Sequence, residues 1–258
     1  MPPGVIRHGI DKNLSLVMAK QADYKCVGMM TQANRIKGSC VLIHPRMVLT
    51  AAHTLTKLDA LDPLIVEYDS LRVRVDSFVI HPWYAENKGA DLAVLYLSET
   101  IHNIPVAKLN TSRKELGKVG TSVGYGNFSV ANNPRDIVDA GRVKSAGQNI
   151  LDSIEGIRLP NHQLPFLYAD FDAPDNTHMN KSGSSSSLEY EYGLDGGDSG
   201  GGMFIQKRKK SLLAGINALQ KKNIADIMRT GTFYGSASEW VRISVFRKWI
   251  KSKLKGLN

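Results

Sequence analysis

The sequence predicts an all-β protein, a barrel or a sandwich, that ends in one α-helix. Two observations support this prediction. Short runs rich in Val, Ile and Leu recur between Gly, Asn, Asp and Ser, and few long segments before the C-terminus have a helical period. Such spacing is typical of antiparallel strands joined by turns. The runs lie at residues 41–43, 47–50, 64–68, 71–75, 92–97, 203–205 and 212–216.

The last segment has a different period. Residues 248–255 have helical spacing, which leaves Trp249, Ile250 and Leu254 free to face a core. We expect this helix at about residues 244–255. The basic run of residues 207–210 lies between two apolar segments and predicts a solvated hairpin turn.

Composition limits the classes of function. The chain has 258 residues, of which 42% are hydrophobic, so it can bury a sizeable core as one large domain or two small ones. The net charge of +9 favours anionic partners, but no nucleic-acid motif accompanies it, so we predict no nucleic-acid partner. No His/Cys cluster has ligand spacing, so we predict no metal and no cofactor.

The chain shows no apolar run of the roughly 18–20 residues that a membrane span needs. Its start, MPPGVIRHGI, lacks the basic segment and apolar stretch of a secretory signal. The protein is therefore either cytosolic or a mature or trimmed form. The only cysteines, Cys26 and Cys40, either pair across a hairpin or stay free, because bridge geometry cannot be read from sequence.

Three separated segments carry chemically active residues. A histidine ends an apolar run behind two alanines, an acid heads another apolar run, and a serine is held among glycines, in residues 48–53, 90–95 and 196–201. Serine is a weak nucleophile that needs a base, and the base needs a partner that fixes its tautomer. Each segment alone is ordinary, but together His53, Asp91 and Ser199 predict a catalytic triad.

With these motifs the chain resembles the chymotrypsin/trypsin family. The resemblance rests on Thr-Ala-Ala-His at residues 50–53 and Gly-Asp-Ser-Gly-Gly at 197–201. With supporting segments the resemblance extends from about Val41 to Ile250. These segments are His-Pro-Trp-Tyr at 81–84, Gly-Tyr-Gly-Asn at 124–127 and Trp-Val-Arg-Ile at 240–243. The chain order His, Asp, Ser argues against subtilisins and α/β-hydrolases.

The resemblance implies one peptidase domain over residues 1–258, folded as two six-stranded antiparallel β-barrels with a C-terminal helix. Barrel one would span about residues 10–112 and barrel two about 118–243, with the boundary near residues 110–120. It also implies a serine endopeptidase that acts on protein or peptide substrates, as an exported (secreted or periplasmic) monomer.

By the same resemblance, each site residue has an expected role. Ser199 would be the nucleophile, His53 the base and then the acid, and Asp91 the orienting carboxylate. The backbone N–H groups of Gly197 and Ser199 would form the oxyanion hole. Gly193 would lie at the floor of the specificity pocket. One wall would be a strand that pairs with the substrate backbone through Ala218, Leu219 and Gln220. The acids Glu189, Glu191 and Asp195 either favour basic substrates or are exposed loop charges.

Two departures from the family stand out. The disulfide beside the catalytic histidine is absent, because Gly38 and Thr54 occupy its usual positions. Activation is also open. In the family a new N-terminal ammonium pairs with the aspartate before the serine, here Asp198, and Val5 or Ile6 would supply it after trimming. Otherwise an internal group such as Arg7 or His8 would have to serve.

Two other classes of function stay open. One is a catalytically silent binding module, a pseudoprotease, against which the intact triad argues. The other is a basic protein that binds anionic polymers on barrels that serve only as scaffold.

Overall fold

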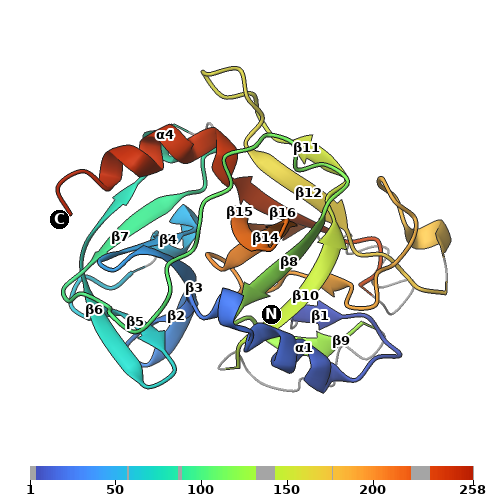
Figure 1. The fold of residues 1–258 in the computed structure, drawn as a ribbon, viewed down its shortest axis with the longest axis horizontal. Helices are drawn as coiled ribbons and strands as arrows, with labels where there is room; N and C mark the ends of the chain where they lie inside the picture. The colour runs from blue at the N-terminus through green and yellow to red at the C-terminus, as the bar shows by residue number, and fades with distance from the viewer. Residues whose placement is uncertain are drawn as a thin grey trace.

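The computed structural model describes residues 4–56, 58–86, 89–131, 143–175, 177–221 and 233–257. In Figure 1 a barrel of six strands lies on one side, and a larger curled sheet lies on the other. No helix in the described ranges is long and apolar enough to cross a membrane. The all-β class with a C-terminal helix is confirmed.

The first lobe is a closed antiparallel barrel in the strand order β2-β3-β4-β7-β6-β5. Its strands are β2 (Val27–Gln32), β3 (Arg35–His44), β4 (Met47–Thr50), β5 (Leu64–Tyr68), β6 (Leu71–Ile80) and β7 (Ala93–Leu97). Five of the seven predicted apolar runs coincide with these strands, and fully buried side chains such as Met30, Leu42 and Leu95 fill the interior. Burying such side chains is the main favourable term in the stability of this lobe.

The second lobe is one curled sheet in the order β10-β8-β14-β15-β16-β12-β11. Its strands are β8 (Val119–Gly124), β10 (Ser145–Ile150), β11 (Ser153–Glu155), β12 (Phe166–Asp170), β14 (Gly202–Lys207), β15 (Lys210–Lys221) and β16 (Ala237–Arg242). Lys207 pairs with Lys210 across the expected hairpin turn.

This sheet differs from the predicted six-stranded barrel, because it has seven strands and leaves β10 and β11 as its edges. A corner at Leu151 and Asp152 is the cause. The N–H of Leu151 still donates to Lys118, next to β8, whereas the N–H of Asp152 donates to Tyr168 in β12. One run of chain thus changes partner at the corner, and its two parts, β10 and β11, count as two strands of a curled half-barrel.

A third, small sheet has the order β13-β1-β9. It is formed by β1 (Gly4–Ile6), β9 (Phe128–Val130) and β13 (Tyr192–Gly193). Strand β1 is its middle strand, antiparallel to β13 and parallel to β9. Helix α1 (Lys12–Ala19) follows and lies beside β10, where Ser15 Oγ accepts a hydrogen bond from the Ala146 N–H.

Helix α4 (Ile243–Lys253) follows β16 and crosses to the first lobe (Figure 1). As predicted, Ile250 is buried, and Trp249 and Leu254 pack against the same core. Short helices lie between strands at η1 (Ala22–Tyr24), η2 (Ala52–Leu55), α2 (Pro82–Ala85) and η3 (Thr177–Met179). Helix α2 and α4 meet around His81, whose ring lies 5.1 Å from that of Phe246.

Candidate active site

Neighbouring strands of the first barrel place a histidine and an aspartate at the same end. His53 lies in η2, directly after β4, and Asp91 lies just before β7. Strands β4 and β7 are paired, with Thr50 opposite Ala93, so the two side chains leave the barrel side by side. The two alanines before His53 are fully buried. Their small side chains allow the chain to turn tightly there.

The two residues meet a serine from the second lobe. Asp91 Oδ2 lies 2.7 Å from His53 Nδ1, and Asp91 Oδ1 accepts the His53 backbone N–H at 2.9 Å. His53 Nε2 lies 2.9 Å from Ser199 Oγ. A carboxylate can only accept, so Nδ1 carries the proton and Nε2 is left to accept from the hydroxyl. The predicted side chains are thus brought within hydrogen-bonding reach.

Glycines allow the loop around Ser199 to pass close to the first barrel. Gly200 has φ +90°, and a Cβ there would collide with Ser39 O and Thr50 Oγ1. The N–H of Ser39 donates to Ser199 O at 2.7 Å, and Ser39 Oγ donates to Gly197 O at 2.8 Å. Ser39 therefore fixes the serine loop to the other lobe, a role that sequence reasoning missed because nothing in its local pattern marks it.

The two backbone N–H groups expected to form the oxyanion hole are those of Gly197 and Ser199. The Gly196 carbonyl accepts the Asn127 N–H at 3.1 Å. Because a trans peptide is planar, the Gly197 N–H points to the opposite side from that carbonyl. In the described part of the chain, the N–H groups of Gly197 and Ser199 donate to no other backbone group. Two such donors can stabilise negative charge that develops on a carbonyl oxygen.

Asp198 is fully buried behind this loop. Its Oδ1 accepts the Gly126 N–H at 2.9 Å, and its Oδ2 accepts the Asp195 N–H at 3.0 Å and the Tyr192 hydroxyl at 2.8 Å. Burial raises the pKa of Asp198 to about 7, although these hydrogen bonds act in the opposite direction. Sequence reasoning singled out Asp198 but missed Tyr192.

The residues expected to bind substrate lie along β15 and β13. The Ala218 carbonyl is 3.5 Å from Ser199 Oγ, at a break in register between β15 and β16. Leu219 is half exposed. Gln220 reaches Gly193, since a Cβ on that glycine would lie 2.8 Å from Gln220 Nε2. Both polar atoms of the Gln220 amide are buried, and neither has a hydrogen-bond partner among the residues that the structure describes.

The nearby acids lie in different surroundings. Glu189 is exposed. Glu191 is buried, and its carboxyl group accepts from Asn149 Nδ2 at 2.8 Å and from the Leu188 N–H at 2.7 Å. Burial raises the pKa of Glu191 well above its ordinary value. Asp195 bonds its own loop at the N–H of Gly196.

Where the family has a disulfide beside the histidine, this chain packs small groups instead. A Cβ on Gly38 would lie 3.0 Å from Thr54 Cγ2, so the two residues are in contact. Thr54 Oγ1 also donates to Ala51 O at 2.7 Å. Cys26 and Cys40 are free and buried, and burial raises the pKa of each thiol to about 12. Among the described residues, no group of three or more His, Cys, Asp or Glu is placed to hold a metal ion.

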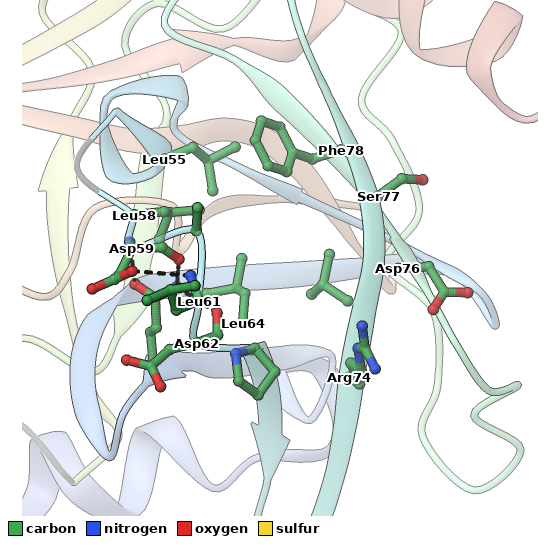
Figure 2. A pocket seen from close by; sticks show the side chains of 14 residues that line it. Leu55, Leu58, Asp59, Leu61, Asp62, Leu64, Arg74, Asp76, Ser77 and Phe78 are labelled. Carbon is green, nitrogen blue, oxygen red and sulfur yellow. Dashed lines mark hydrogen bonds between the residues drawn. The ribbon is translucent and has the colours of Figure 1, made fainter.

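Figure 2 shows a separate hollow of about 730 Å³ on the first barrel. The segment from Leu58 to Leu64 forms one wall and β6 the other, with Leu55 of η2 and Phe78 at one end. Gln32 fixes this wall, because its amide donates to Asp59 O and Asp62 O, each at 2.8 Å. Neither His53 nor Ser199 lines this hollow, so it is separate from the candidate active site.

Comparisons with known proteins agree with this geometry. The trypsin family model matches residues 18–250. The solved structure of neuropsin, a serine protease expressed in the limbic system of mouse brain, is 16% identical and has a TM-score of 0.61. That match covers 90% of this chain and 95% of the neuropsin chain, and it shows a shared chymotrypsin-like fold. A search of curated proteins gives no match. The chain therefore belongs to the trypsin family.

Proposed function

We propose that this protein is a serine endopeptidase that cleaves peptide bonds through an acyl-enzyme. The observation that carries the proposal is the unbroken series of contacts from Asp91 through His53 to Ser199, with bonds of 2.7 and 2.9 Å. These contacts join a base to a nucleophile and an orienting group to the base. Within the described residues the N–H groups of Gly197 and Ser199 donate to no other backbone group, so they would supply the fourth element, an anion-stabilising pair.

The proposed reaction follows from these atoms. His53 Nε2 takes the proton of Ser199 Oγ as Oγ attacks the carbonyl carbon of the substrate. The tetrahedral oxyanion is held by the two backbone N–H groups, and Asp91 stabilises the imidazolium. His53 then gives the proton to the leaving amine, which breaks the C–N bond. Water, activated by His53 in its turn, hydrolyses the acyl-enzyme and restores Ser199.

Substrate would lie along β15. The Ala218 carbonyl lies beside Ser199 Oγ at a bulge, and the neighbouring Leu219 side chain is half exposed. An extended peptide is able to add to such an edge as a further strand. We propose that Ala218, Leu219 and Gln220 bind the substrate backbone and that Gly193 lies at the base of the pocket for the side chain next to the cut.

Hydrolysis of a mixed peptide library tests the proposal. The wild-type chain should cut peptides at internal bonds, and mass spectrometry of the products will give the preferred residue. Ser199→Ala is the matched control, since it removes only Oγ and should lower turnover by about 10⁶-fold. No cleavage by a folded wild-type chain, or equal cleavage by the two proteins, would favour a pseudoprotease that binds without cutting.

A further inference from the structure

The partner of Asp198 is not the group that the family resemblance led us to expect. The buried carboxyl group accepts hydrogen bonds from the Tyr192 hydroxyl and from two backbone N–H groups. The Arg7 and His8 side chains, the two internal groups considered for this role, contact other partners. Arg7 donates to Leu188 O at 3.0 Å, and His8 Nε2 lies 2.8 Å from Asp175. Neither of these internal groups serves Asp198.

Val5 and Ile6 are held in strand β1. Both are buried in β1, at 0% and 1% exposure, as the middle strand of the small sheet. Ile6 lies opposite Tyr192 in the β1–β13 pair, so β1 supports the strand that carries the tyrosine. A cut before Val5 or Ile6 would therefore shorten this middle strand.

Tyr192 supplies a buried hydrogen-bond donor to Asp198. Its side chain is fully buried, and its hydroxyl lies 2.8 Å from Asp198 Oδ2 and 3.2 Å from Ser145 Oγ. Burial raises the pKa of Tyr192 well above its ordinary value, so the phenol stays protonated and can donate. The tyrosine thus supplies a neutral donor to the carboxyl group.

The same carboxyl group fixes the loop that carries the oxyanion donors. Asp198 lies between Gly197 and Ser199, and its Oδ1 accepts the N–H of Gly126. The next residue, Asn127, donates its N–H to the Gly196 carbonyl and so orients the peptide that presents the Gly197 N–H. A Cβ on Gly126 would overlap the Asp198 carboxyl group, so the contact is close. Movement of Asp198 would therefore disturb both oxyanion donors.

We propose that Tyr192 is a positioning residue that holds Asp198 in place of an N-terminal ammonium, so that the chain is competent with β1 intact. The inference rests on the proposed function. It assigns to a buried phenol the task that proteolytic activation performs elsewhere in the family. It also assigns β1 a permanent structural role beneath that phenol.

Tyr192→Phe tests the hydroxyl directly, because it keeps the ring and removes one oxygen. Losing a hydrogen bond to a charged acceptor should slow the reaction by about tenfold to hundredfold. We therefore expect kcat to fall by that factor while KM stays within about twofold. Ser145→Ala is the matched control. It removes the other partner of the same hydroxyl, keeps the bond to Asp198, and should leave kcat unchanged. An unchanged kcat for a folded Tyr192→Phe variant would overturn the proposal.

A second measurement uses the wild-type chain alone and does not depend on how Tyr192→Phe folds. A fluorophosphonate probe is added to protein whose N-terminus is extended by a blocked residue, and the intact mass is then measured. Labelling of the full-length blocked chain supports the proposal. Labelling only after a cut before Val5 or Ile6 overturns it. If neither the blocked nor the cut chain is labelled, the proposed peptidase function fails, and this inference fails with it.

Discussion

Asp91→Asn is the substitution whose effect follows most directly from the geometry. In the wild type, Oδ1 accepts the His53 backbone N–H at 2.9 Å, and Oδ2 faces Nδ1 at 2.7 Å. The backbone donor cannot reverse its role, so the amide oxygen of asparagine must take the Oδ1 position. The NH₂ group then faces Nδ1, and two donors cannot share one bond. The imidazole proton moves to Nε2, which can no longer accept the proton of Ser199.

The loss should be about 10⁴-fold in kcat, which corresponds to about 5 kcal/mol of activation free energy. The assay is steady-state hydrolysis of the best library peptide at pH 8. Asp175→Asn is the matched control, because Asp175 makes the same kind of contact with His8 at 2.8 Å but is exposed and outside the triad. The control should keep full activity. A fall of less than about tenfold for Asp91→Asn would refute the assigned roles.

Three further predictions concern stability and the thiols. Glu115→Ala should lower the free energy of unfolding, measured by urea titration, by about 3–5 kcal/mol. The reason is that buried Arg242 loses the carboxylate that lies 2.8 Å from its guanidinium group. A loss below about 1 kcal/mol would contradict this. Burial raises the pKa of Asp172 to about 8, above its unfolded value of 3.8, so the folded state keeps a proton that the unfolded state releases. Stability should therefore fall as pH rises from about 4 to about 8, and Asp172→Asn should flatten this fall in thermal melts, whereas an equal slope in both proteins would oppose the assignment. Cys26 and Cys40 should not react with a thiol reagent at pH 8 until the protein is denatured, and fast reaction of the native protein would show that they are not buried.

Local patterns predicted the strands and singled out the three side chains that the fold brings together, for different reasons. Strands such as β3, β4 and β7 bury short apolar runs, and this signal lies in adjacent residues. The triad was predictable because His53 and Ser199 lie in contexts that restrict the backbone, namely small alanines before one and glycines around the other. These restrictions are local, so they are visible without the fold.

The remaining features depend on contacts between distant segments. The corner after β10 arises because Leu151 and Asp152 bond different strands, and no residue pattern marks such a change. Tyr192 looks like an ordinary core aromatic until the fold brings its hydroxyl to Asp198. The meeting of Gln220 with Gly193 likewise depends on how β15 passes β13. These positions are set by contacts between segments that lie far apart in the sequence, and the period of the apolar residues carries no information on such contacts.

Reaction of the native protein with a fluorophosphonate, followed by peptide mapping, tests most directly whether the hydroxyl at the lobe junction is activated. The geometry predicts modification of Ser199 alone, at one probe per chain, and loss of that modification in His53→Ala because the base is gone. An unmodified Ser199 in folded protein, or modification that persists at the same rate without the imidazole, would contradict the assigned mechanism.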